Sequence, residues 1–382
     1  MRHTASVPDP DFMKALTLKR RRIFAAFVVK LSQMMSNTNS LPQDVKVFWH
    51  QLLAPYQVSD TWRSIWQLAN TLIPYFTLWA LMFLSLKVSY WLTLVLSLPT
   101  GGFMVRVFII FHDCGHGSFF KSKKANEIVG AVTGILTFTP WHRWWHDHAV
   151  HHATAGDLDR RGVGDVYVMT VKEYLQAPWW KKAAYRLMRN PFDLFVIGAP
   201  IVFGVTQRIP GRKDGKRERA SVWWTNLALV LLIGLLIWLV GWKAYLLVQA
   251  PIFLLGTWTG VWLFYVQHQF EGVYWERHDK WNFFEAGLKG CSFYKLPRLL
   301  KWFTGNIGFH HIHHLSARIP NYRLEECYRE NPVLQQAKTL TLLSGFKSMS
   351  LRLYDESSRQ LLGWKVLKLY RQVKLNTNRE NG

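Results

Sequence analysis

The sequence predicts an all-α membrane protein, with four transmembrane helices in two hairpins and a cytoplasmic helical cap that carries a histidine-rich metal site. Three observations point to this fold class. Four apolar runs each approach the roughly 20 residues that a helix needs to span a bilayer. Most of the lysine and arginine lies outside the two hairpins. Ten of the 15 histidines fall in three short clusters beyond or between these hairpins.

The four apolar runs define the predicted spans, at about 68–86, 91–111, 223–240 and 245–266. Tight turns that carry little besides Lys87 and Lys243 join the members of each pair. The other basic residues lie in the remaining segments, so the positive-inside rule puts both termini and the central loop in the cytoplasm. We therefore expect a cytoplasmic cap built from residues 112–221 and 267–382.

A further apolar stretch, residues 194–205, interrupts the central loop. If this stretch crossed the membrane, the third histidine cluster would lie on the opposite side from the first. Because several histidines must converge on one ion, we expect all three clusters on one side. We therefore predict that residues 194–205 form an interfacial or re-entrant segment.

The chain is strongly basic, with a formal net charge of +23. The basic residues concentrate beside the spans, as at 19–22 and 212–217, where they orient a membrane protein and meet anionic headgroups. We therefore expect no nucleic-acid partner. Residues 1–65 are predicted to form a basic amphipathic N-terminal segment, and residues 66–382 the main domain. Three scattered cysteines do not make a disulfide framework and suit a reducing compartment.

The histidine clusters predict metal binding, because neutral imidazole ligates zinc, copper, iron or nickel. Residues four apart on a helix share a face about 6 Å apart along the axis, so His112 and His116 can bind one ion, and we expect the same of His148 with His151 and His152. The other clusters hold further candidates: His148, His151 and His152 in one, and His310, His311, His313 and His314 in the other. A zinc ion takes about four ligands, often including cysteine. At least eight clustered histidines without a cysteine pair favour two metal ions that share the three clusters.

In order and spacing, these clusters resemble the three histidine boxes of the membrane fatty acid desaturase family. The fuller strings at 151–165 and 305–310 are similar to the bacterial acyl-lipid branch that acts at the Δ12 or ω-6 position. The resemblance covers roughly Leu68 to Tyr328. It implies a di-iron centre with two iron ions as cofactors and O2 as co-substrate. The implied box ligands are His112, His116, His148, His151, His152, His310, His313 and His314.

The resemblance also implies a ninth ligand after the last span, and His268 matches that place. A lone histidine near an apolar face is more often structural. His268 lies at the cytoplasmic end of the fourth span, level with His112, and this position favours ligation. We expect His146 and His311 to face away from the metals, and His278 to belong to no cluster.

Five aspartates lie within or shortly after the first two boxes in the sequence: Asp113, Asp147, Asp157, Asp159 and Asp165. Ligating histidines usually donate their second N–H to a carboxylate or a carbonyl, and these residues offer that acceptor. The alternative for each is helix capping, or pairing with Arg160 and Arg161.

The resemblance implies O2-dependent desaturation of a fatty acyl chain in membrane lipid, with insertion of a second double bond (Δ12/ω-6). An acyl hydroxylase, or a desaturase of other regiospecificity, would share every box and stays open as an alternative. A membrane metal carrier is the other alternative. It would need ionisable residues along a path through the spans, and only Arg106 lies well inside one.

The family chemistry needs a lipid chain and electrons at the metals. We expect the spans and residues 194–205 to wall a tunnel for the chain. No haem-binding or iron–sulfur module is recognisable, so we expect a separate ferredoxin-like or cytochrome b5-like electron donor, attracted by the basic surface. We expect a multi-pass protein of the bacterial cytoplasmic membrane, with the active site and both termini in the cytoplasm.

Overall fold

The computed structural model describes residues 43–370 of the chain. The chain divides into two compact units, Met1–His50 and Gln51–Gly382. Most of the predicted N-terminal segment, residues 1–65, lies outside the described residues, so its amphipathic character and its boundary stay predictions. Helix α2 (Gln43–Leu53) and the short η1 (Ala54–Tyr56) precede the first long helix. The description below concerns the second unit.

Four helices are long and apolar enough to cross a membrane, which confirms the predicted number of spans. They are α3 (Thr61–Ser85), α4 (Tyr90–Gly115), α10 (Lys216–Val240) and α11 (Trp242–His268). Each helix extends beyond the predicted apolar run, because the helical backbone continues into polar sequence. Asp60, for example, starts α3 early by accepting hydrogen bonds from the backbone N–H groups of Trp62 and Arg63.

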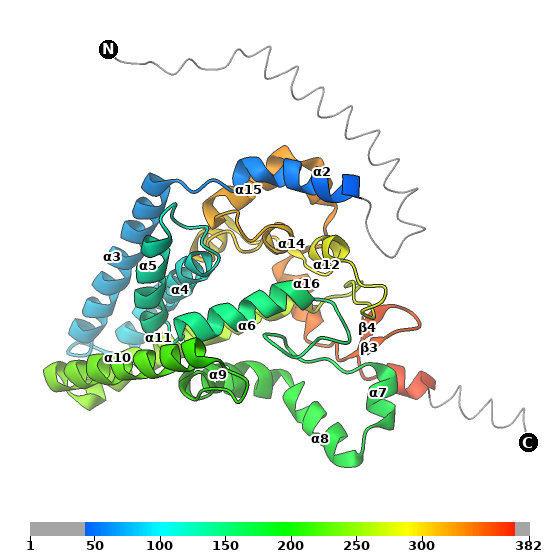
Figure 1. Cartoon of the computed structure of the whole chain (residues 1–382). Helices are drawn as coiled ribbons and strands as arrows, with labels where there is room; N and C mark the ends of the chain where they lie inside the picture. The colour runs from blue at the N-terminus through cyan, green and yellow to red at the C-terminus, as the bar shows by residue number, and fades with distance from the viewer. Residues whose placement is uncertain (1–42, 371–382) are drawn as a thin grey trace, which may run out of the picture. The chain divides into compact units, whose positions relative to one another are not determined.

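Helix α4 is the central helix of the four, and it packs against both α3 and α11. Figure 1 shows α3, α4 and the following helix α5 (Lys123–Leu136) side by side. Glycine permits close contact between α4 and α11, since a Cβ atom added at Gly101 would lie 2.7 Å from Leu255 Cβ. The packed side chains include Tyr75 and Met82 of α3 and Ile252 of α11. This packing places the ends of α4 and α11 next to each other.

The central apolar stretch does not form a fifth straight span. It lies in a chain of α8 (Trp179–Met188), the π-helical η2 (Phe192–Gly198), α9 (Ala199–Gly204) and η3 (Thr206–Arg208). The first helix and the rest are bent by 64°. The end of this segment returns to the cap, where Arg143 donates to the carbonyl oxygens of Thr206 and Ile209 at 3.0 and 2.6 Å. The interfacial or re-entrant character of residues 194–205 stays a prediction.

The cap consists of short elements that follow α4, precede α10 and follow α11. Its helices are α6 (Trp141–Thr154), α7 (Val171–Gln176), α12 (Phe283–Lys289), α13 (Arg298–Phe303), α14 (His310–Leu315), α15 (Asn321–Glu330), η4 (Pro332–Gln336) and α16 (Leu342–Ser348). The sequence did not predict its two strand pairs. Strands β1 (Phe293–Tyr294) and β2 (Thr339–Leu340) pair in parallel, with Phe293 opposite Thr339, while β3 (Leu353–Asp355) and β4 (Gln360–Leu362) pair antiparallel, with Tyr354 opposite Leu361.

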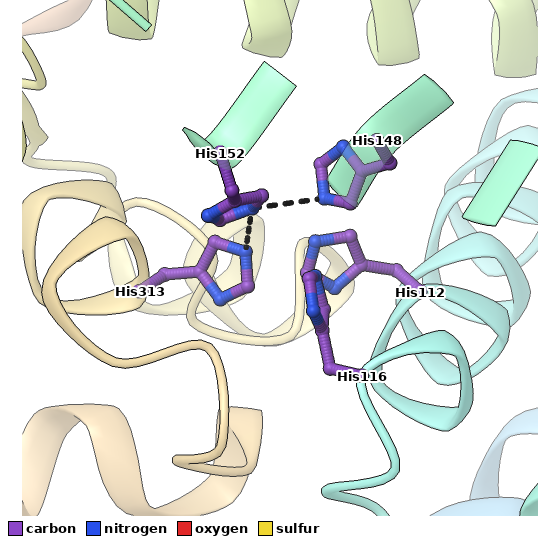
Figure 2. A group of neighbouring side chains, drawn as sticks. All are labelled: His112, His116, His148, His152 and His313. Carbon is purple, nitrogen blue, oxygen red and sulfur yellow. Dashed lines mark hydrogen bonds between the residues drawn. The ribbon is translucent and has the colours of Figure 1, made fainter. Parts of the chain in front are cut away.

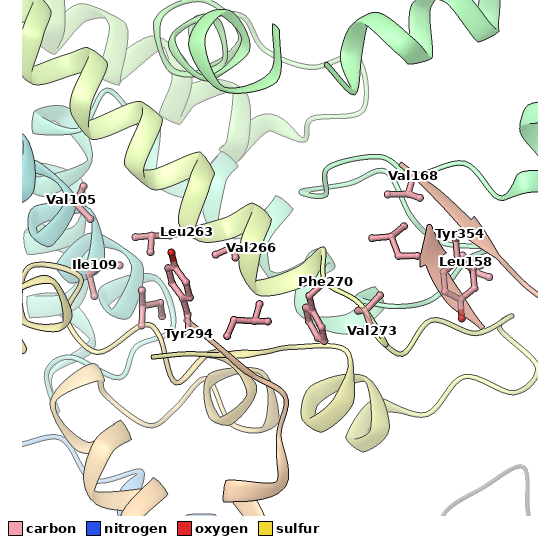
Figure 3. Close-up of a cluster of buried hydrophobic side chains, with 13 residues drawn as sticks. Val105, Ile109, Leu158, Val168, Leu263, Val266, Phe270, Val273, Tyr294 and Tyr354 are labelled. Atoms are coloured by element: carbon pink, nitrogen blue, oxygen red, sulfur yellow. The ribbon is translucent and has the colours of Figure 1, made fainter. Parts of the chain in front are cut away.

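A continuous apolar core joins the long helices to the cap. Figure 3 shows Val105 of α4 and Leu263 and Val266 of α11 in one cluster with Tyr294 of β1 and Tyr354 of β3. Because burial of these side chains is the main stabilising contribution, the cap is fixed relative to the ends of α4 and α11. This fixed arrangement positions the histidines.

Candidate metal centre

The structure brings all nine predicted ligands together, in two groups. Within each group, one ligand atom from every residue lies within 4.8 Å of all the others. Group one contains His112, His116, His148, His152 and His313, and group two contains His151, His268, His310 and His314. The three boxes therefore contribute to two neighbouring groups, each with enough imidazole nitrogens to hold one ion, and the two bound ions stay a prediction.

Helix geometry explains how α6 and α14 supply both groups. Residues four apart on a helix share a face, whereas successive residues point about 100° apart. His148 and His152 therefore face group one, and the adjacent His151 turns toward group two. The same spacing sends His310 and His314 to group two and His313 to group one. Our expectation that the second cluster acts as one set is wrong for this reason.

Group one lies where the end of α4 meets α6 and α14. Figure 2 shows His112 and His116 facing His148 and His152, with His313 closing the ring. The Nε2 atom of His152 lies 3.1 Å from Nε2 of His148 and 3.0 Å from Nε2 of His313. The ring of His116 is partly exposed, and its Nε2 has no hydrogen-bond partner among the described residues.

Group two is more deeply enclosed, because all four of its histidines are buried. The Nε2 atom of His268 lies 3.1 Å from Nε2 of His151 and 2.9 Å from Nε2 of His310. A neutral imidazole carries a single N–H, so His268 cannot satisfy both neighbours and its own second nitrogen by hydrogen bonding. A cation between these nitrogens satisfies all of them, and the residues present fit a bound metal.

The protonation of the rings agrees with this fit. Burial, followed by the charges of neighbouring imidazoles, lowers the pKa of five cap histidines well below the usual value: His148, His152, His310, His313 and His314. The same two causes lower the pKa of His116. The rings are therefore neutral near pH 7 and offer lone pairs to a metal.

Two of the five aspartates contact Nδ1 of a predicted ligand, where a metal-bound histidine usually donates its second N–H. Asp165 accepts from Nδ1 of His151 at 2.5 Å. Asp113 lies 3.0 Å from Nδ1 of His112, and its other oxygen accepts from the backbone and side-chain N–H groups of Asn321 at 2.7 and 2.8 Å. These contacts fix the tautomer that leaves Nε2 facing the group.

The other three aspartates form no hydrogen bond with a predicted ligand in the described part of the chain. Asp159 pairs with Arg277 at 2.6 Å. Asp157 accepts from Nδ1 of His278 at 2.7 Å. His278 therefore lies in a hydrogen-bonded pair with Asp157 and belongs to neither histidine group, as expected; the two residues are 121 positions apart, so no local pattern could indicate the contact.

The two remaining histidines of the clusters lie outside both groups. His146 is exposed on α6. His311 is fully buried near the rings of Phe293 and Tyr328, and burial lowers its pKa to about 3. Neither imidazole belongs to group one or group two, as we predicted.

A large cavity of about 640 Å³ reaches the centre from the membrane helices. One face each of α4 and α11 and the segment η2–α9 form its apolar walls, with Phe108, Phe264 and Val202 as examples. His112, His148 and His310 line its inner end, so the cavity contacts both groups. No sequence motif marks these wall residues; they are recognised only once the helices are packed.

Arg106 does not line a path through the spans. Its Nε donates to Thr71 Oγ1 at 3.0 Å, and its guanidinium lies 4.0 Å from the ring centre of Trp302, whose backbone carbonyl it also contacts. These contacts attach α13 to α3 and α4. Arg106 thus has a structural environment, which weakens the metal-carrier alternative further, because Arg106 was its one candidate for an ionisable residue on a path through the spans.

Comparison with known proteins agrees with this geometry. The fatty acid desaturase family model matches residues 89–341. A fatty acid desaturase of Bacillus subtilis is 48% identical over 316 residues, covering 83% of this chain and 90% of the relative. An sn-1 acyl-lipid omega-3 desaturase (ferredoxin) of Synechocystis is 29% identical over 57% of this chain and 61% of the relative. An sn-1 oleoyl-lipid 12-desaturase of Anabaena variabilis is 27% identical over 64% and 70%. With its histidine groups, membrane helices and matched length, the chain belongs to the fatty acid desaturase family.

Proposed function

We propose that this enzyme introduces a double bond into the acyl chain of a membrane lipid, using O2 and two irons held by the nine histidines. The observation that carries the proposal is the apolar cavity, whose inner end touches both histidine groups through His112, His148 and His310. Its volume of about 640 Å³ lies within the usual range of ligand pockets, about 300 to 1,000 Å³. Bound iron supplies the O2 chemistry that removal of hydrogen from an unactivated methylene requires.

The chain's own residues bind the acyl chain and orient the histidines. Wall residues such as Phe108 and Phe264 hold methylenes by burial, which favours an acyl chain over a polar substrate. Asp113 and Asp165 hold His112 and His151 with Nε2 directed inward. The outer face of the η2–α9 wall is exposed and apolar, as at Ile197 and Ile201, so a lipid can approach it directly from the bilayer.

The position of the new double bond is a finer proposal. The strings around the boxes favour Δ12 (ω-6), while the named relatives act at position 12 and at omega-3. Expression in a host without polyunsaturated lipids, followed by double-bond mapping, tests the position. A new bond at carbon 12 supports the proposal, and a bond elsewhere refutes this position alone. A hydroxylated product instead would identify the hydroxylase alternative.

Metal analysis tests the centre itself. We expect about two irons per chain, one for each histidine group, and little zinc. Imidazole affinity alone does not select iron over zinc, so the expectation rests on the O2 chemistry. An active preparation that contains zinc and no iron would overturn the di-iron proposal.

We propose that the electron donor is a separate acidic carrier, of the ferredoxin or cytochrome b5 type, and that it docks beside group one. Lys121, Lys123, Lys124 and Arg318 are exposed and form no salt bridge with other described residues. Lys121 follows His116 by five residues, a span of at most about 18 Å. Tyr322, near Arg318, donates to the carbonyl of Phe119 at 3.2 Å, which joins the two basic segments.

Charge reversal tests this docking surface. A triple variant (Lys121→Glu, Lys123→Glu, Lys124→Glu) should raise KM for the carrier and weaken its salt dependence, because steering by opposite charges is reduced. Reduction by dithionite should be unchanged. The control triple (Lys338→Glu, Lys365→Glu, Lys368→Glu) changes net charge equally at exposed sites of other elements. Equal KM values in both triples would exclude the surface.

We place the enzyme in the bacterial cytoplasmic membrane, with the centre and both termini in the cytoplasm. The support is that all nine histidines meet at one end of the long helices, and that the basic residues 212–217 lie where α10 begins, at that same end. Reporter fusions at each terminus test the orientation. A periplasmic signal from either terminus would contradict it.

A further inference from the structure

The apolar cavity is bounded where α4 and α11 come into contact, and we call this boundary its floor. Met104 lies eight residues before His112 on α4, and Gly260 lies eight residues before His268 on α11. At the helical rise of about 1.5 Å per residue, both are roughly 12 Å below the ligand at the end of their own helix. Both residues line the cavity.

Below this level the two helices are in direct contact. A Cβ atom added at Gly256, one turn deeper than Gly260, would lie 2.7 Å from Sδ of Met104. A Cβ added at Gly101 would lie 2.7 Å from Cβ of Leu255. Such distances leave no room for a methylene chain between α4 and α11, so the Met104 side chain, which packs against Gly256 in the cavity wall, bounds the cavity between these two helices.

Gly260 differs from these contact glycines. A Cβ added there meets no atom within 4 Å, although Gly260 faces the cavity together with Gly256 and Phe264. The missing side chain is therefore not required by helix packing. Glycine inside a helix is less favourable than alanine, so a glycine here costs stability while it keeps the cavity wide.

Open space beside a helical glycine is not by itself informative. Gly234 on α10 also has no atom within 4 Å of an added Cβ, but it is exposed on the outer face and does not line the cavity. What distinguishes Gly260 is the combination of open space, cavity lining and a level equal to that of the floor residue.

We propose that Gly260 and Met104 are specificity-determining residues, which set the length of acyl chain held between the floor and the metal groups. This inference rests on the proposed acyl-chain function of the cavity. A side chain at position 260 fills space at the floor and leaves room for fewer methylenes. Removal of the Met104 side chain uncovers Gly256 and leaves room for more.

The size of the effect follows from the chemistry of apolar pockets. One extra or missing methylene in such a pocket typically changes discrimination by about 10-fold or more. We therefore expect Gly260→Leu to lower the ratio of long-chain to short-chain turnover by at least about 10-fold. Met104→Ala should change the same ratio in the opposite direction, and Gly260→Ala should give an intermediate shift.

The test presents phospholipid mixtures whose acyl chains differ in length to the full-length enzyme in membranes, and measures products and double-bond positions by mass spectrometry. Gly234→Leu is the matched control, since it makes the same substitution in a membrane helix away from the cavity. Metal content of each variant monitors the integrity of the centre.

Opposite shifts for Gly260→Leu and Met104→Ala, with parental behaviour of Gly234→Leu, support the inference. Parental chain-length ratios in active Gly260→Leu and Met104→Ala overturn it. If Gly260→Leu fails to accumulate, Gly260→Ala takes its place. Opposite shifts of the chain-length ratio in Gly260→Ala and Met104→Ala then support the inference, and parental ratios in both overturn it. Failure of the parent enzyme to oxidise any chain would instead refute the proposed function.

Discussion

His268→Ala tests the assignment that depends least on a sequence motif. Its Nε2 lies 3.1 and 2.9 Å from the corresponding atoms of His151 and His310, at the centre of group two. The substitution reduces that group from four histidines to three. Loss of an outer contact to a metal ligand already weakens binding by 10- to 100-fold, so loss of a ligand should cost at least about 1.4 to 2.8 kcal/mol.

That loss should be visible as a smaller metal-dependent stabilisation. A metal that binds only the folded state raises stability according to its affinity, so the difference in Tm with and without a chelator should shrink in His268→Ala. Truncation of a buried ring also destabilises the metal-free protein, by about 2 to 5 kcal/mol for large apolar side chains. The chelator comparison separates the two effects.

The control for this experiment is His146→Ala, because His146 is exposed on α6 and belongs to neither group. His278 is unsuitable as a control, since it bonds to buried Asp157. We expect lower iron content and activity in His268→Ala and parental values in His146→Ala. Equal iron content and equal metal-dependent Tm shifts in the two variants would refute the argument and leave His268 structural.

Three further predictions follow from the centre. We expect no turnover in three single variants, His116→Ala, His151→Ala and His313→Ala. Membrane fractionation should still recover each protein in the membrane, because the spans are untouched. Near-normal product in all three variants would contradict the di-iron assignment. Asp165→Asn should weaken iron binding about 10- to 100-fold, measured by competition with a chelator, whereas Asp159→Asn, which pairs with Arg277 instead of a ligand, should not. Burial lowers the pKa of the five cap histidines, so below about pH 6.5 the unfolded chain binds more protons than the folded chain. As the pH is lowered through this range, the free energy of unfolding of the metal-free protein should fall by up to about 1.4 kcal/mol per pH unit for each histidine. A Tm that does not change between pH 7.5 and 5.5 would contradict this prediction.

The ligands were predictable because helical spacing and the order of the boxes are both local properties of the sequence. Residues four apart, such as His148 and His152, must share a helix face. The division between the two groups was also implicit in this spacing, since His151 and His152 cannot face one ion from one ideal helix. Our expectation neglected the angle of about 100° between neighbours.

Hydropathy predicted the number of spans and missed their ends. An apolar run reports only the part of a helix inside the bilayer, and α10 begins at Lys216 because its first turns lie in the polar cap. Hydropathy and local motifs also could not predict contacts between residues far apart in the sequence, such as Asp157 with His278 and Asn321 with Asp113. The cavity walls belong to the same class, because they depend on how three helical segments pack.

The sharing of α6 and α14 between the two groups has a consequence for assembly. Each of these helices carries histidines of both groups, so in the proposed di-iron centre binding of one ion would fix the orientation of helices that the other ion needs. The entropy of ordering them is then lost once, and the second ion should bind more tightly than the first. Intermediate states with a single ion should be sparsely populated, and a chain in an iron-poor cell would divide between empty and fully loaded molecules.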